Sequence, residues 1–213
     1  MNEEIYRILQ DRILFLEYEP GRILNEKVLA AEFGISRTPL REVLNRLEWA
    51  QLVRILPRTG TMVAEIDYQK MMNVYPIRLE LEAMAGRLAA EHIAPGHLVR
   101  LAAVGERCAA LQGIVDKNAL VNIDFDFREI IYDAAENEVL TGMSGELYRL
   151  TVRLWYVTLD RKSWDEEVHA ILNEITSSQE VLGRGDAPGM AELRRASLIS
   201  HLERIRAKFL ALC

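Results

Sequence analysis

Residues 24–63 read LNEKVLAAEFGISRTPLREVLNRLEWAQLVRILPRTGTMV, and this stretch decides the fold. Lys27–Phe33 is predicted to form a short helix that ends at Gly34, because glycine permits the left-handed backbone of a sharp turn. Ser36 is placed to cap a second helix. The apolar residues of that helix recur at helical spacing and predict one buried stripe: Leu40, Val43, Leu44 and Leu47.

A hairpin is predicted after the second helix. Val53–Leu56 and Thr61–Val63 have the composition of short strands, and residues 57–60 form the tip between them. Arg58 and Gly60 at this tip suit a wing, since the glycine allows close backbone approach and the arginine can lie against a DNA groove or phosphate. The stretch therefore predicts a winged helix-turn-helix with a small β-hairpin.

The second helix carries polar and basic residues opposite its apolar stripe. Residues 36–61 hold five arginines against two glutamates, a net charge of +3, in a chain whose net charge is −6. A basic island in an acidic protein is typical of a nucleic-acid surface. On the residue pattern alone, an amphipathic helix pair with solvated arginines is the alternative. The side chains that could reach phosphates or base edges are Arg37, Thr38, Arg41, Asn45 and Arg46.

The runs SRTPLREVLNRLE at residues 36–48 and QLVRILPRTGTMV at residues 51–63 resemble the signature of the GntR family of bacterial transcriptional regulators. The upstream NEKVLAAEFGI at residues 25–35 stands at the spacing of that family. The resemblance implies sequence-specific DNA binding, and Lys27 matches a basic residue that the family uses on phosphate, with a solvated lysine as the alternative. The expected DNA-binding residues are Lys27, Ser36, Arg37, Thr38, Arg41, Arg46, Arg58, Thr59 and Gly60.

The composition bounds the class of protein. The chain has 213 residues, of which 50% are apolar, and this allows two small domains with real cores. The first residues, MNEEIYRILQ, lack the basic and apolar regions of a signal peptide, and no apolar run is long enough to span a membrane. Cys108 and Cys213 are too few and too far apart for a disulfide framework or a zinc ribbon. We therefore expect a cytoplasmic protein with reduced thiols and no membrane partner.

Two domains are expected. Residues 1–66 form the DNA-binding domain, to which an opening helix at residues 5–16 belongs, and residues 67–213 form a second domain for dimerisation and effector binding. The second domain shows no strand-like alternation, so it is predicted to be an all-α bundle of about six helices, and the whole chain is mainly α. Its predicted helices are a short one at residues 71–74, one that begins at Pro76, and others at residues 98–115, 120–135, 138–159, 164–182 and 188–210.

Three stretches of the second domain resemble the effector domain of the FadR branch of the GntR family, called the FCD domain. They are IRLELEAMAGRLAAEHI at residues 77–93, DFDFREIIYDAAENEVL at residues 124–140 and GRGDAPGMAELRRASLISHLERI at residues 183–205. The resemblance implies a small-molecule effector in the bundle. We also expect a homodimer, because two reading heads match a palindromic operator on double-stranded DNA.

In that family the effector domain often holds a divalent metal. Its ligands are an Asp, a His four residues later, and two further histidines on the last two helices. Asp124 matches the first position, whereas the other three positions hold Arg128, Ile175 and Ser197. An arginine cannot ligate a cation, so we expect no metal cofactor. Only a gap in this alignment would bring His169 or His201 back to a ligand position.

Arg128 at a former ligand position places a fixed cation beside Asp124. One interpretation is an internal pair between the two side chains. The other is that Arg128, together with Arg78, binds a carboxylate of the effector, because a guanidinium matches a carboxylate with two parallel hydrogen bonds. The expected effector-binding residues are Arg78, Asp124, Arg128, Tyr156, Ser197 and His201.

Two classes of function follow from these patterns. The first is a ligand-responsive transcriptional regulator, with repression as the expected action. The second is an all-α metal-binding or metabolite-binding protein, or an enzyme, in which the helix-turn-helix is incidental. An enzyme is not expected, because the histidines stand in no catalytic spacing. They are His92, His97, His169 and His201.

Overall fold

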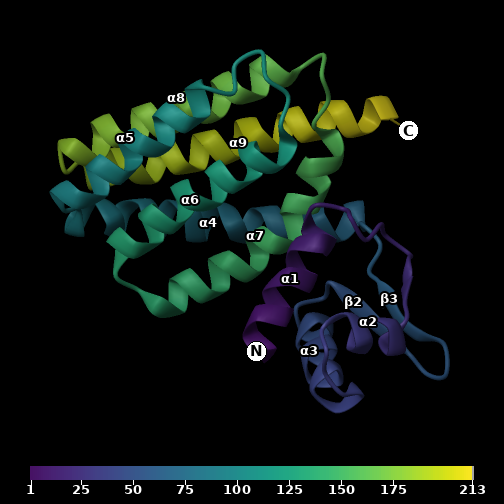
Figure 1. Ribbon diagram of the computed structural model, residues 1–213. Helices are drawn as coiled ribbons and strands as arrows, with labels where there is room; N and C mark the ends of the chain where they lie inside the picture. The colour runs from purple at the N-terminus through teal and green to yellow at the C-terminus, as the bar shows by residue number, and fades with distance from the viewer. Residues whose placement is uncertain (213) are drawn as a thin grey trace. The chain divides into compact units, whose positions relative to one another are not determined.

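The computed structural model describes residues 1–212, so Cys213 lies outside the described part of the chain. The chain divides into two compact units, Met1–Tyr68 and Gln69–Cys213. The first unit is a winged helix-turn-helix and the second is helical, as the sequence predicts (Figure 1). No helix in the described residues is long and apolar enough to cross a membrane.

The first unit packs three helices against a small sheet. The core contains the stripe predicted from Leu40 to Leu47, and all four of its side chains are fully buried. Leu9 and Ile13 of the opening helix are also fully buried. The elements are α1 (Asn2–Leu14), β1 (Ile23–Leu24), α2 (Glu26–Glu32), α3 (Arg37–Trp49), β2 (Val53–Leu56) and β3 (Gly60–Val63).

The sheet has three antiparallel strands in the order β1-β3-β2, one more than the sequence indicates. Strand β1 pairs Leu24 with Thr61 of β3, and β2 pairs Leu56 with Gly60. A strand of two residues is too short to show an alternating pattern, so β1 could not be recognised from its composition. Its pairing covers the outer edge of β3 at Thr61 and Met62.

The helices of the second unit are longer. Their packing buries Cys108, and burial raises the pKa of its thiol to about 11. Helices α6 and α7 form a hairpin that turns at Glu136 and Asn137 (Figure 1). The elements are α4 (Tyr68–His92), α5 (Pro95–Ala109), α6 (Lys117–Ala135), α7 (Glu138–Thr158), α8 (Trp164–Gly183) and α9 (Ala187–Leu212).

The sequence prediction for α4 was wrong at Pro76. A short helix was expected to end before this proline, but α4 runs through it without interruption. A proline inside a helix removes one backbone hydrogen bond and costs about 3 kcal/mol. Helix α4 buries Val74 and Tyr75 before the proline and Arg78 and Glu82 after it. We infer that tertiary packing on both sides offsets the local cost.

Candidate functional site

The exposed face of α3 starts at the N-terminal end of the helix. Arg37, Thr38 and Arg41 are exposed there, while the apolar stripe on the opposite face is buried. Ser36 stands at the N-cap position as expected, but its side chain makes no capping hydrogen bond. The first amides of a helix have no intrahelical partner and carry partial positive charge, so this end of α3 favours a phosphate.

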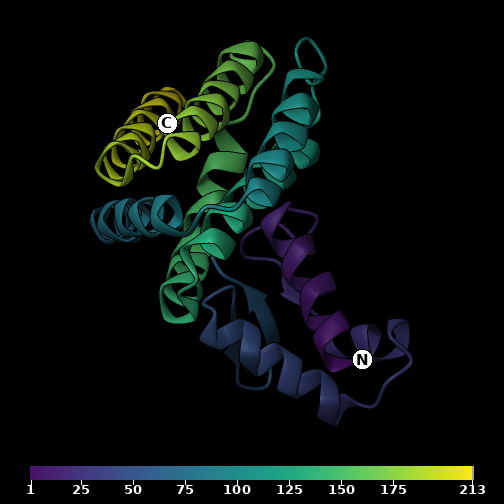
Figure 2. The same cartoon turned by 90° about the vertical axis from the view of Figure 1, so that its left-hand side faces the viewer.

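Two arginines of the expected DNA-binding set have carboxylate partners. Arg41 donates from Nε to Glu26 Oε2 at 3.0 Å, and 65% of its side chain stays exposed. Arg46 donates to Glu3 Oε2 at 2.8 Å, and its guanidinium lies 4.2 Å from the centroid of the Tyr6 ring. The N-terminal end of α1 thus lies beside α3 (Figure 2), and its Glu3 carboxylate occupies one side of the Arg46 guanidinium.

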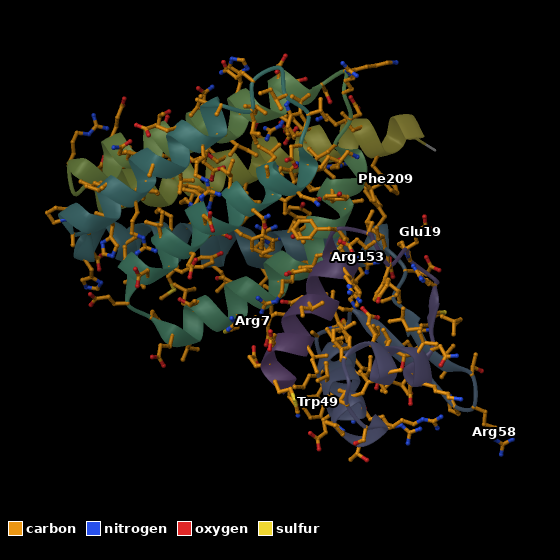
Figure 3. All side chains as sticks on the ribbon, viewed as in Figure 1. Arg7, Glu19, Trp49, Arg58, Arg153 and Phe209 are labelled. Atoms are coloured by element: carbon orange, nitrogen blue, oxygen red, sulfur yellow. The ribbon has the colours of Figure 1, made fainter. Side chains whose placement is uncertain are left out.

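The wing depends on left-handed backbone at two positions. Arg58 has a φ of 64° and Gly60 a φ of 127°. A Cβ atom on Gly60 would lie 3.1 Å from the Leu24 carbonyl oxygen, so the glycine also permits the close pairing of β1 with β3. The side chain of Arg58 points away from the rest of the unit at the hairpin tip (Figure 3), and Thr59 is exposed beside it.

Replacing Gly60 by Ala should destabilise the first unit by about 1–3 kcal/mol. Alanine is strained at this φ, and its methyl group would crowd the Leu24 carbonyl oxygen. Thermal unfolding followed by circular dichroism measures the effect. Thr59→Ala is the matched control, since Thr59 is exposed at the same tip. Equal melting temperatures for the two variants would contradict this role of the glycine.

Two further cations of the first unit are exposed outside α3. Lys27 is exposed on α2, and Arg54 is exposed on β2. Arg54 is not in the expected DNA-binding set, because an exposed arginine on a short strand has no distinctive pattern. Glu48, one of the two acids counted against the arginines, accepts a hydrogen bond from the Ile55 amide at 2.7 Å. Its carboxylate is therefore turned to the hairpin.

In the second unit, Glu82 lies at the centre of a buried polar cluster. Its side chain is 1% exposed, and its carboxylate accepts hydrogen bonds from Arg128 and from the Tyr132 hydroxyl, both at 2.8 Å. Arg194 donates to the same carboxylate, and Arg78 Nη2 lies 3.5 Å from it. Burial alone would raise the pKa of Glu82, but the three guanidinium groups hold it well below its usual range.

Asp124 joins this cluster through Arg128. Arg128 donates from Nε to Asp124 Oδ2 at 2.9 Å, and the Tyr148 hydroxyl donates to the same oxygen at 2.5 Å. Burial would raise the pKa of Asp124, but these two partners lower it. Burial also disfavours the charged form of Arg128, yet the adjacent carboxylates raise its pKa well above the ordinary value. The cation is therefore permanent.

The structure brings three of the six expected effector residues into this cluster, namely Arg78, Asp124 and Arg128. Arg78 donates from Nη1 to the Thr151 hydroxyl at 2.5 Å. The Tyr156 hydroxyl donates to Asn118 Oδ1 at 2.8 Å, beside the N-terminal end of α6. Ser197 is half-buried on α9. The roles of these residues in ligand binding stay predictions.

His201 faces a second buried carboxylate, that of Glu167. Its Nδ1 atom lies 3.7 Å from Glu167 Oε1, and its ring centroid lies 5.2 Å from that of Trp155. Lys208 and Arg204 pair with the same carboxylate at 2.7 and 3.2 Å. Burial lowers the pKa of His201, so at neutral pH this ring is a neutral member of the cluster.

Sequence reasoning missed four members of the first cluster. The spacing of Arg78 and Glu82 places them one helical turn apart. The neighbouring Glu80 is exposed, however, and nothing in the local sequence tells it apart from the buried Glu82. Only the packing of α4 against α6 and α9 separates the two glutamates. The missed residues are Glu82, Tyr132, Tyr148 and Arg194.

The metal of the FCD family does not fit these residues. Arg128 and Tyr148 already donate to Asp124, and Ile175 is a fully buried apolar side chain. His169 is exposed, with Nδ1 2.6 Å from the Asp165 carbonyl oxygen. Within the described residues, no three His, Cys, Asp or Glu side chains are grouped to hold a metal ion. A tight transition-metal site needs three or four ligands, and a guanidinium beside the one carboxylate repels a cation.

A groove of about 950 Å³ lies between α6 and α7. Arg128, Tyr132 and Tyr148 line it, and each of them turns its polar atoms toward the buried carboxylates. Of the six expected effector residues, only Arg128 lines this groove. The groove thus borders the polar cluster through Arg128, Tyr132 and Tyr148.

Both parts of the chain match described protein families. Residues 1–63 match the bacterial regulatory proteins of the gntR family, and residues 73–204 match the FCD domain. The solved structure of Escherichia coli McbR/YncC covers 98% of this chain and 98% of that chain with a TM-score of 0.84 and 23% identity. A putative GntR regulator from Rhodococcus sp. RHA1 aligns over 97% of each chain with a TM-score of 0.78 and 17% identity. These two structures show the fold.

Curated relatives are named regulators. The HTH-type transcriptional regulator McbR of Escherichia coli K12 is 32% identical over 130 residues, 61% of this chain and 59% of McbR. The HTH-type transcriptional repressor GlaR of the same strain is 26% identical over 208 residues, 92% of this chain and 91% of GlaR. The match to YdhC of Bacillus subtilis, an uncharacterised regulator, covers 63% of that protein.

Proposed function

Because the chain belongs to the GntR family of bacterial regulatory proteins and carries an FCD domain, we propose that it is a ligand-responsive transcriptional regulator. One observation supports this most directly. The first unit presents five exposed cations on α2, α3, β2 and the wing tip, while the apolar stripe of α3 is buried. They are Lys27, Arg37, Arg41, Arg54 and Arg58.

The proposed DNA contacts follow from this geometry. The N-terminal end of α3 enters the major groove, where Arg37, Thr38 and Arg41 reach base edges and phosphates. The wing carries Arg58 along the backbone or into the adjacent groove. One head reads only a half-site, so we propose that two copies bind a palindromic operator as a homodimer.

The effector is proposed to bind in the FCD domain beside Arg128. A small molecule that fits only one arrangement of the dimer shifts the equilibrium toward it by its differential affinity. Repression is the proposed action, and it is supported by relatives such as the repressor GlaR. Localisation in the cytoplasm accords with a DNA-binding role.

Arg41→Ala should weaken operator binding by about 1–3 kcal/mol, through the loss of a base-edge or phosphate contact. A gel-shift titration on the DNA upstream of the protein's own gene measures this loss. Arg161→Ala is a matched control, because Arg161 is an exposed arginine of the second unit. Thermal stability should stay close to wild type, since the Arg41 pair with Glu26 is exposed.

A variant at Arg41 that binds the operator like wild type would remove this residue from the interface. If the wild-type chain itself gives no shift on any fragment of its upstream DNA, the proposed function fails. Sedimentation that shows a monomer bound tightly to the operator would contradict the homodimer.

A further inference from the structure

Helix α4 carries an apolar stripe that the second unit leaves partly exposed. Its four side chains recur at spacings of four, three and four residues, which is the a/d pattern of a coiled-coil seam. Ile77 is 53% exposed and Met84 is 41% exposed, and the other two side chains are half-buried. We call these residues the α4 stripe, and they are Ile77, Leu81, Met84 and Leu88.

The opposite side of α4 is already occupied by its own unit. Arg78 and Glu82 enter the buried polar cluster there. Gly86 lies against α9, where a Cβ atom would stand 3.0 Å from the Met190 carbonyl oxygen. Figure 2 shows α4 at one side of the helical unit. The stripe is therefore the side of α4 that remains open to a partner.

Polar residues bound the α4 stripe at its ends and along one edge. Asn73 and Glu91 are exposed one turn beyond its two ends. Glu80 and Arg87 are exposed along the edge, one helical repeat apart at g positions of the seam. Glu80 pairs with Arg195 at 2.8 Å, yet 72% of its side chain stays exposed. Arg87 forms no ion pair within the described residues, so it is open to a carboxylate from outside.

The apolar positions match those of a second copy of α4 that runs antiparallel. An antiparallel seam places each a position opposite a d position, so Leu81 faces Met84 of the partner subunit and Ile77 faces Leu88 of the partner subunit. The symmetry repeats both pairs, and every member of the α4 stripe then has an apolar partner.

The charges along the edge favour the same direction. The antiparallel register brings Glu80 beside Arg87 of the partner subunit, and the symmetry repeats this pair. In a parallel seam a g position faces an e position, and the e position next along α4 is Ala85, which is fully buried in its own unit. The opposite charges of the edge therefore meet only in the antiparallel arrangement.

We propose that two copies of this chain associate through the α4 stripe, with their α4 helices antiparallel about a two-fold axis between Leu81 and Met84. The interface is isologous, because the same residues meet from both copies. Ile199 widens it, since it follows Arg195 by one turn on α9 and is 42% exposed. Apolar burial stabilises the dimer, and the surface ion pairs mainly set its orientation. The inference rests on the proposed homodimer but is tested without DNA.

Sedimentation equilibrium of the full chain over a concentration series measures the association. We expect a dimer whose dissociation constant rises roughly tenfold or more in Met84→Glu, because carboxylates would then be buried in an apolar seam. Met143→Glu is the matched control, since Met143 is 51% exposed on α7, away from the stripe. Melting temperatures show that both variants are folded. A monomeric wild type, or equal dissociation constants for the two variants, overturns the inference.

Cysteine variants in a Cys213→Ser background test the direction, and Cys108 is too deeply buried to compete. With a short bismaleimide, Met84→Cys should cross-link to its own copy, because this position lies near the axis. Leu88→Cys alone should not, since its two copies would stand about 16 Å apart along the axis. A mixture of Ile77→Cys and Leu88→Cys chains should cross-link. Self-linking of Leu88→Cys would show parallel helices and overturn the proposed arrangement.

The two proposals fail separately. A wild-type chain that shifts its operator and stays dimeric in Met84→Glu contradicts the α4 interface alone. A chain that dimerises through the α4 stripe but never shifts DNA contradicts the proposed function alone.

Discussion

Replacing Glu82 by Gln should destabilise the second unit by about 3–5 kcal/mol. The amide keeps the shape of the side chain but removes the negative charge that faces Arg78, Arg128 and Arg194. Removing one partner of a buried ion pair leaves uncompensated charge in a poorly polarisable interior, and this cost exceeds that of most point mutations. Arg128 retains Asp124, but Arg194 keeps only the half-buried Glu174.

Urea unfolding of the full chain measures this effect. Trp155 and Trp164 are buried in the second unit, whereas Trp49 of the first unit is 80% exposed. The red shift of tryptophan fluorescence during unfolding therefore reports mainly the unfolding of the second unit. Glu80→Gln is the control on the same helix, because the Glu80 side chain is 72% exposed and pairs only at the surface with Arg195. The explanation fails if the midpoints of the two variants coincide.

Operator affinity should fall by about 10³–10⁵-fold between 50 and 200 mM salt. A protein that neutralises six to ten phosphates releases that many counterions, and the salt slope follows their number. Each head presents five exposed or largely exposed cations. The two heads of a dimer can therefore neutralise a number of phosphates within the range of about six to ten. Fluorescence anisotropy on the operator in a potassium chloride series measures the slope.

Lys27→Ala should reduce that slope by about one per head, since Lys27 is proposed to contact one phosphate. Lys162→Ala is the control, because Lys162 is an exposed lysine of the second unit. A shallow slope in wild type, or an unchanged slope in Lys27→Ala, would show that the exposed cations of the head do not neutralise phosphate as proposed.

Local patterns predicted the first unit well because its signals are short-range. The buried stripe of α3, the glycine at the turn and the hairpin each depend on neighbours within a few residues. Strand β1 escaped detection, because its two residues are ordered by pairing with β3 from across the unit. Pro76 shows the opposite failure, since a correct local rule was overridden by packing on both sides of the proline.

The polar cluster was predictable only in part. The pair of Asp124 and Arg128 follows from helical spacing, and the structure confirms that they interact. The third partner, Glu82, lies 42 residues before Asp124 in the sequence. No local pattern distinguishes Glu82 from Glu80. Whether Arg128 also contacts a ligand stays a prediction. Long-range partners of buried charges are set by helix packing, which a single sequence does not reveal.

The guanidinium of Arg128 also has a consequence for how this regulator is maintained in a cell. A cation that is part of the polypeptide is present as soon as the chain is translated, and its raised pKa means that no physiological acidity removes it. It cannot be extracted by a chelator or exchanged for a competing ion. The charges that Arg128, Asp124 and Glu82 bring to the polar cluster are thus set by the amino-acid sequence and do not vary with the supply of trace metals.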